Sequence, residues 1–250
     1  MKITFLGTSH GVPQRGRNCS AAMLEIGESI YFIDGGAPLI EEFLKIKSEE
    51  DLKKIRGIFT THAHSDHTVG IFHMASLMDW FYKLPLDIYL TEEAIKDAMC
   101  NLYMACKSDS CSFNPELIRF HLETDDFVYN DENVRISFIP TAHMQDFGRP
   151  SFAILVEAEG KRVLFSGDFS QNLEKNDVPP IVTEEHLDLF VCEMAHFSFN
   201  TLYPTLKNCK AERVYINHIW RAPKFDEILA ASREFNFELR ALDDGDVVKL

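Results

Sequence analysis

Thr61-His-Ala-His-Ser-Asp-His67 is the stretch that decides the fold of this chain of 250 residues. It places three imidazoles and one carboxylate within seven positions. His62 and His64 are two positions apart, so on an extended chain their side chains point to the same side, whereas ligand pairs on a helix are three or four positions apart. The run is therefore expected in a loop, between a strand over 57–60 and a helix over 67–83.

Three more candidate ligands follow apolar runs that are rich in β-branched and aromatic residues: His143 after Val134-Arg-Ile-Ser-Phe-Ile-Pro140, Asp168 after Lys161-Arg-Val-Leu-Phe-Ser-Gly167, and His218 after Arg213-Val-Tyr-Ile-Asn217. Each run is predicted to be a strand, and strand ends present side chains accurately from a rigid scaffold. The complete set of candidate metal ligands is His62, His64, Asp66, His67, His143, Asp168 and His218. Five imidazoles and two carboxylates suit two borderline-soft divalent ions held side by side.

This order of donors resembles the metallo-β-lactamase fold superfamily, and the resemblance runs along the whole chain. Three further segments resemble its phosphodiesterase branch, which includes ribonuclease Z: Ile3-Thr-Phe-Leu-Gly-Thr-Ser-His-Gly-Val-Pro13, Arg17-Asn-Cys-Ser20 and Ile33-Asp-Gly-Gly36. The resemblance implies an α/β fold, a four-layer αββα sandwich, in one metallo-hydrolase domain over 1–250. It also implies one metal on His62, His64 and His143, another on Asp66, His67 and His218, and Asp168 as the bridge.

The donor set favours hydrolysis, by attack at phosphorus or by addition to a carbonyl, and does not by itself choose between the two. Two divalent ions, two carboxylates and a metal-bridging hydroxide sum to about one positive charge, which attracts an anionic ester and stabilises charge that grows on it. Asp66 and Asp168 would position the hydroxide. We expect a two-metal-dependent hydrolase, above all a phosphodiesterase acting on a small nucleotide-like or cyclic phosphate diester. The expected ions are zinc, with manganese or iron as alternatives.

His196 completes the expected catalytic set, which is Asp66, Asp168 and His196. His196 resembles, by its place in the sequence, the histidine that acts as general acid for the leaving oxygen in the ribonuclease Z-like group. Glu193 would orient the ring of His196. The alternative, that both residues only end a strand, stays open. Asp34 is expected as a hydrogen-bond partner of the metal loop and not as a ligand. Candidates for phosphate contacts are Arg15, Arg17, Arg149 and Arg221, and His10 is a candidate for the lining of the pocket.

The charge balance limits the partners. With 39 acidic against 25 basic residues the formal net charge is −14, and no stripe of lysine and arginine is present. A protein that grips a long nucleic acid needs several phosphate-neutralising cations, so the expected partner is a small anionic phosphodiester. In ribonuclease Z a tRNA-gripping arm typically lies between the ligands that match His143 and Asp168. Only 24 residues separate them here, so that arm is expected to be missing.

One segment, at about 91–115, is expected to be a helical insertion. Core packing, a lid over the site and a homodimer contact are the alternatives for its role. The six cysteines, with no secretory leader, indicate reduced thiols and a cytoplasmic protein. No apolar stretch approaches the roughly 18 residues of a membrane span, so no membrane association is expected.

Three other functions stay open. A glyoxalase II-like thioesterase or lactonase resembles this chain in the same seven ligands, but such enzymes usually append a helical region after the last histidine, and only 32 residues follow His218. The others are a tRNA 3′-processing endoribonuclease and a non-catalytic metal-binding protein.

Strands are predicted near 2–6, 21–26, 29–34, 57–60, 86–90, 126–130, 133–139, 151–158, 161–166, 188–192, 212–216 and 246–249. Helices are predicted near 37–46, 67–83, 91–105, 202–208 and 224–234.

Overall fold

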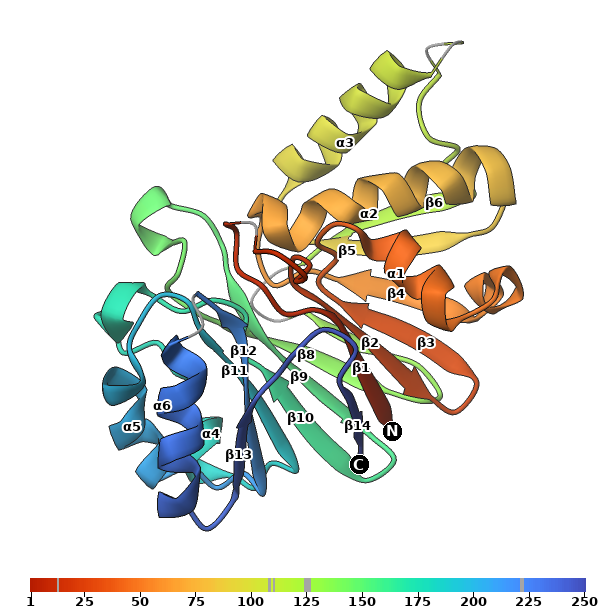
Figure 1. The fold of residues 1–250 in the computed structure, drawn as a ribbon. Coiled ribbons are helices and arrows are strands. Elements are labelled where there is room, and N and C mark those ends of the chain that lie inside the picture. Colours follow the sequence, from red (N-terminus) through yellow and green to blue (C-terminus); the bar gives the residue numbers. More distant parts are fainter. Residues whose placement is uncertain (13, 108, 110, 124–126, 221–222) are drawn as a thin grey trace.

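Two seven-stranded sheets face each other in the computed structural model, which describes residues 1–12, 14–107, 109, 111–123, 127–220 and 223–250 (Figure 1). The first sheet has the order β14 (Val247–Lys249), β1 (Lys2–Gly7), β2 (Ala21–Ile26), β3 (Ser29–Ile33), β4 (Ile55–Phe59), β5 (Leu86–Leu90) and β6 (Ile118–Leu122). The second has the order β13 (Glu238–Ala241), β12 (Arg213–Ile219), β11 (Leu189–Met194), β10 (Lys161–Phe165), β9 (Phe152–Ala158), β8 (Arg135–Pro140) and β7 (Val128–Asn130).

Helices cover the outer face of each sheet (Figure 1). The first sheet carries α1 (Leu39–Ile46), α2 (Ser65–Leu77) with its π-helical continuation η2 (Met78–Tyr82), and α3 (Glu93–Cys106). The second carries α4 (Ile181–Glu184), α5 (Phe199–Lys207) and α6 (Pro223–Ala231). Four short 3₁₀ turns complete the described elements: η1 (Glu49–Lys54), η3 (Gln145–Phe147), η4 (Gln171–Leu173) and η5 (Ser232–Glu234).

Strand periodicity builds three apolar layers from these elements. In β3, Tyr31 and Ile33 point into the cluster between the sheets, whereas Ile30 and Phe32 point into the cluster under the helices of the first sheet. Such alternation is the consequence of a side-chain period of two along a strand. A third cluster lies between the second sheet and its helices. Helix, sheet, sheet and helix therefore form the predicted αββα sandwich.

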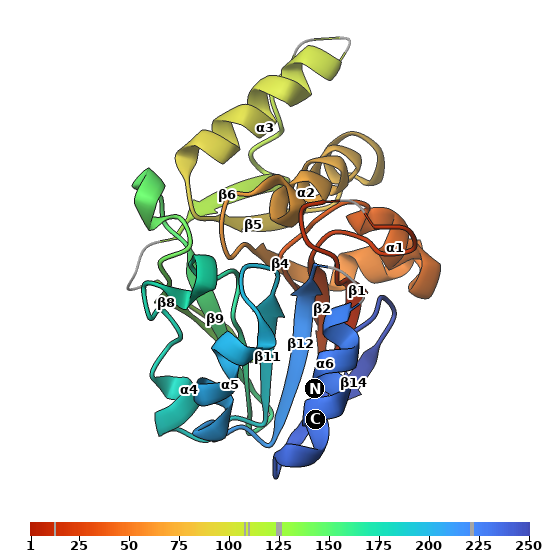
Figure 2. The ribbon, with the colours of Figure 1, turned by 60° about the vertical axis from the view of Figure 1, so that its left-hand side comes forward.

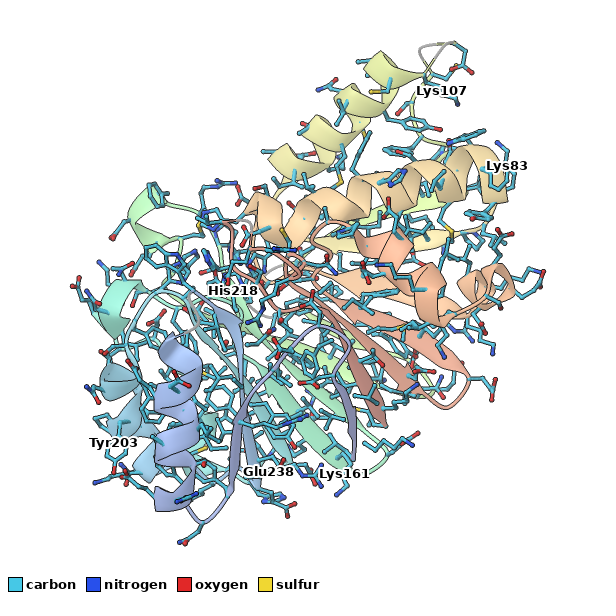
Figure 3. The ribbon with its side chains drawn as sticks, viewed as in Figure 1. Lys83, Lys107, Lys161, Tyr203, His218 and Glu238 are labelled. Carbon is cyan, nitrogen blue, oxygen red and sulfur yellow. The ribbon has the colours of Figure 1, made fainter. Side chains whose placement is uncertain are left out.

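The strand directions determine where a site can form. In the first sheet β3, β4, β5 and β6 run parallel, and in the second β10, β11, β12 and β13 do. Ligands of open α/β sheets bind outside the carboxyl ends of parallel strands. His218 lies there, near the end of β12 (Figures 1 and 3).

Two strands and the short helix α4 were not predicted, and two helices, α2 and α5, begin earlier than predicted; α5 begins at Phe199, not at 202. β6 and β13 are both edge strands, and β6 directly follows the segment predicted to be an insertion. α2 begins at Ser65, not at 67, so that Asp66 lies in its first turn. An acidic side chain there interacts favourably with the positive end of the helix dipole. Part of the predicted strand 126–130 and of the predicted segment 91–115 lies outside the described residues.

The segment predicted as an insertion contains α3, which projects away from the two sheets (Figures 1 and 2). That it is an insertion relative to other proteins, and that 1–250 is one domain, stay predictions. All six cysteines are free thiols. Within the described part of the chain, no helix has the length and apolar character needed to span a bilayer.

Candidate metal centre

The loop after β4 carries the histidine-rich run and is fixed by backbone hydrogen bonds to both sheets. Thr60 N–H donates to Tyr89 O at 3.1 Å, and the carbonyl of Thr61 accepts from Phe152 N–H of β9 at 2.9 Å. The side chains of His62 and His67 are buried, and that of His64 is partly buried. The loop therefore joins the two sheets where their carboxyl ends meet.

The first group of donors consists of His62, His64, His143 and Asp168. His62 Nε2 lies 3.0 Å from His64 Nδ1, and His143 Nε2 lies 3.2 Å from the same atom. Asp168 Oδ2 lies 3.6 Å from His62 Nε2 and 3.7 Å from His143 Nε2. Three nitrogens and one carboxylate oxygen thus face a common point.

The second group consists of Asp66, His67 and His218, and Asp168 reaches it as well. Asp66 Oδ2 lies 3.5 Å from His67 Nε2 and 3.7 Å from His218 Nε2. Asp168 Oδ1 lies 3.6 Å from His67 Nε2, and its Oδ2 lies 3.4 Å from His218 Nε2. Asp168 is the residue within reach of both groups, as expected for a bridge.

These separations fit a pair of divalent ions. Ligand atoms about 2.0–2.2 Å from a tetrahedral ion are about 3.3–3.6 Å from one another, close to the distances observed here. Among the described residues, His67 Nε2 and Asp168 Oδ1 are buried without a hydrogen-bond partner. Buried polar atoms are nearly always paired, so a ligand accounts for these two better than apolar packing does.

Hydrogen bonds behind the donors orient their rings. His143 Nδ1–H donates to the carbonyl of Phe169 at 3.0 Å, so its Nε2 lone pair points to the centre. His67 Nδ1–H donates to Asp34 Oδ2 at 2.7 Å in the same way. Asp34 also accepts from Thr61 N–H at 2.8 Å. The predicted contact of Asp34 with the metal loop is confirmed, and such contacts fix tautomer and orientation in metal sites.

The electrostatics of the rings follow from burial and from the acids around them. Burial lowers the pKa of His62 and of His64, so both rings are neutral donors at neutral pH. Burial also opposes the charged form of His67, but Asp34 and Asp168 outweigh it and raise the pKa of His67 well above its usual range. For Asp168, burial is outweighed by the neighbouring rings, His218 first, so its pKa lies well below the ordinary value.

Two unusual backbone positions bring the last two ligands into place. His218 is the extra residue of a bulge in β12, because Asn217 pairs with Glu193 and Ile219 with Met194. Its φ of 49° is uncommon for a residue with a side chain, and bulges next to active sites re-aim side chains. Gly167, just before Asp168, has φ 56° and packs so closely that a Cβ would lie 2.5 Å from the carbonyl of Phe152.

His196 lies beside the centre and is held by Glu193. Its Nδ1–H donates to Glu193 Oε1 at 2.9 Å, and its ring centroid is 4.6 Å from that of His143. Glu193 is itself buried and accepts from Phe169 N–H and Ala195 N–H. Burial opposes the charge on His196, but Glu193 and then Asp168 raise its pKa to about 9. The predicted hydrogen bond between Glu193 and His196 is confirmed.

A cavity of about 270 Å³ opens over the donors. Besides His64, Asp66, Asp168, His196 and His218 it is lined by His10, Gly11, Val12, Gln171, Ala195 and Trp220. Trp220 follows the end of β12, and its ring lies beside that of His10. The sequence analysis missed Trp220, because the bulge at His218 interrupts the alternation of the strand.

The three described arginines that were predicted to contact phosphate are not among the residues that line the cavity. Arg17 donates to the carbonyls of Thr8 and Leu242, and Arg149 pairs with Glu92 at 2.9 Å. Arg15 is exposed and is not among the described residues that line the cavity. Arg221 lies outside the described residues. His10, predicted to line the pocket, is among the described residues that line this cavity.

The sequence was compared with protein families. The family described as Anti-Pycsar protein Apyc1 matches residues 1–222. The chain belongs to this family. The Apyc1 family match covers all seven predicted ligands and His196. A ribonuclease Z of Synechococcus sp. (strain CC9902) is 31% identical over 157 residues, which are 57% of this chain and 46% of that protein. The chain thus aligns with about half the length of this curated relative.

Solved structures share the fold of this Apyc1 family member. The metallo-beta-lactamase fold protein YhfI from Bacillus subtilis matches with a TM-score of 0.75 and 16% identity, covering 99% of each chain. The short form of human tRNase Z matches with a TM-score of 0.71 and 19% identity, covering 100% of this chain and 99% of the other. The predicted metallo-β-lactamase fold and the ribonuclease Z-like branch are confirmed.

Proposed function

We propose that this protein is a metal-dependent phosphodiesterase that acts on a small nucleotide-like or cyclic phosphate diester. The observation that carries the proposal is the convergence of seven donors into two groups that share Asp168. When bound there, two divalent ions supply a nucleophile that is deprotonated near neutral pH and stabilise charge on the phosphoryl oxygens. Zinc is the proposed metal, and manganese and iron remain the alternatives.

Residues of the chain would do the remaining work. His62, His64 and His143 would hold one ion, and the second group, Asp66, His67 and His218, would hold the other. The Asp168 carboxylate is within reach of both groups and would contribute to both. His196 lines the cavity, and its Nδ1 is occupied by Glu193, so Nε2 is the atom that would give a proton to the leaving oxygen.

The name of the aligned relative favours phosphodiester chemistry. The short segment between His143 and Asp168 and the charges on α3 favour a small substrate. The aligned relative is named ribonuclease Z, and a ribonuclease cleaves the phosphodiester bonds of RNA. Between His143 and Asp168 the chain forms only η3 and the hairpin of β9 and β10. The projecting α3 carries Glu93, Lys96 and Asp97, so it does not offer the cluster of cations that a tRNA backbone requires. The family is described as an anti-Pycsar protein, and we propose that this protein likewise acts against Pycsar.

The test combines metal analysis with a substrate panel. The purified protein is assayed for bound zinc, manganese and iron, and for hydrolysis of bis-p-nitrophenyl phosphate, the four 3′,5′-cyclic ribonucleotides and an acyl thioester. H64A and D168A should abolish turnover and lower the metal content. The matched control is H73A, because His73 is exposed on α2 and pairs with Glu41. Wild-type hydrolysis of the thioester with no hydrolysis of any diester would refute the proposal.

A further inference from the structure

The cavity over the candidate centre is lined by two chemically different kinds of residue. The donors are His64, Asp66, Asp168, His196 and His218. The apolar residues include Val12 and Trp220, and Trp220 is 43% exposed. Among the described residues that line the cavity, none is a lysine or an arginine. A ligand that matches both kinds of residue is an anion joined to a flat, largely apolar group.

Trp220 is held firmly although it comes after the last residue of β12. The preceding residue, Ile219, donates its N–H to Thr8 O at 3.4 Å, and its carbonyl accepts from Gln14 Nε2 at 2.9 Å. Ser9 and Ile219 also form a parallel bridge. The first loop of the chain and the end of β12 thus fix the backbone from which the indole projects.

His10 connects the indole to the donors. Its ring centroid lies 5.6 Å from that of Trp220, at an angle of 58°, and 6.3 Å from that of His218 in an edge-on arrangement. His10 Nδ1 accepts a hydrogen bond from Val12 N–H at 3.1 Å, and this contact holds the orientation of the imidazole ring. The rings of Trp220, His10 and His218 therefore form a continuous row that leads from the indole to the donors.

We propose that Trp220 is a specificity-determining residue on which the nucleobase of the substrate stacks, while the phosphodiester lies at the donors; this inference rests on the proposed function. An indole face is the best aromatic surface for a heterocyclic base, and stacking tolerates any of the four bases. The cavity volume, about 270 Å³, lies near the lower limit of small-molecule sites, so one nucleotide unit fits and a longer chain would extend outside.

The kinetic test compares diesters with and without a base. Substrates are the four 3′,5′-cyclic ribonucleotides and glycerol 1,2-cyclic phosphate, and variants are W220A and W220F. Loss of one base stack costs about 5- to 150-fold in affinity, so W220A should raise KM for the nucleotides by that factor and leave the base-free diester unchanged. W220F should retain most of the affinity. The matched control is W80A, because Trp80 is also exposed but lies on η2.

A binding measurement gives a readout that does not depend on turnover. The chain has two tryptophans, so in a W80F protein Trp220 is the one indole fluorophore. The four ribonucleoside 5′-monophosphates should quench its emission, whereas ribose 5-phosphate, which lacks the base, should not. Equal quenching by ribose 5-phosphate, or no quenching by any nucleotide, would overturn the stacking role.

The outcomes separate the two proposals. If the wild-type protein hydrolyses none of the diesters, the proposed function fails. If it hydrolyses them and W220A changes KM for the nucleotides and for glycerol cyclic phosphate equally, or for neither, the phosphodiesterase stands and the role of Trp220 is wrong.

Discussion

Replacing Asp34 by asparagine should weaken metal binding without unfolding the chain. Asp34 is buried at the end of β3 and accepts hydrogen bonds from Thr61 N–H, Thr61 Oγ1 and His67 Nδ1–H. Its φ of 60° is one that asparagine also adopts readily, and the two side chains have nearly the same volume. The substitution therefore changes the hydrogen-bonding capacity and little else.

The size of the effect follows from the tautomer of His67. An asparagine that keeps its oxygen toward Thr61 presents its amide N–H₂ to His67 Nδ1, which then becomes an acceptor. The proton moves to Nε2, the atom that faces Asp66 and Asp168, and blocks its lone pair. Loss of such a supporting partner typically costs 10- to 100-fold in metal affinity, about 1.4–2.8 kcal/mol.

The assay is competition for zinc with a chelator of known affinity, alongside urea denaturation of the metal-depleted protein. D131N is the matched control, because Asp131 also accepts several hydrogen bonds, among them those from the hydroxyls of Tyr31 and Tyr129, but is not among the donors. D34N should lose affinity for one ion, and D131N should keep wild-type affinity for both. Wild-type affinity in D34N would show that Asp34 does not set the orientation of His67.

Three further substitutions give distinct results. Burial raises the pKa of Glu123 well above the value near 4.3 of an unfolded chain, so rising pH should destabilise the wild type by about 1.4 kcal/mol per unit between those two values. E123Q should remove that slope, which urea denaturation at pH 5 and pH 8 would measure; equal slopes would contradict it. G167A should cost about 1–3 kcal/mol of folding free energy and reduce metal content, because φ is positive and a Cβ meets the carbonyl of Phe152. H196A should keep its metal but lose about 10²- to 10⁴-fold in rate on diesters with alkoxide leaving groups, and far less on bis-p-nitrophenyl phosphate. An equal loss on both substrates would exclude the acid role.

The donors could be predicted because their signal is local. Their spacing in the loop after β4, and the apolar run before each of the other three, are visible without knowledge of any long-range contact. β9 and β10 could be predicted for the same reason, because β9 is mostly a run of buried apolar residues and β10 ends in three of them. These features determine the four layers and the position of the site.

What could not be predicted depends on contacts between distant segments. β13 is a short edge strand with one buried residue, so its sequence lacks the signature of a buried strand. The bulge at His218 appears only in the pairing of β12 with β11. The ion pair of Arg149 with Glu92 depends on how two separate loops meet, so the sequence indicated a phosphate contact where the structure has an internal partner.

The shared ligand set has a consequence for how this chain unfolds. Asp66 and His67 follow strands of the first sheet, whereas Asp168 and His218 belong to the second, so neither half can separate from the other while both keep their donors in place. Bound ions would therefore cross-link the two halves. The midpoint of thermal denaturation should rise with free zinc concentration by mass action. The halves would then melt as one cooperative unit in zinc, whereas chelation would leave the apolar layer and the hydrogen bonds between the two halves to hold them together.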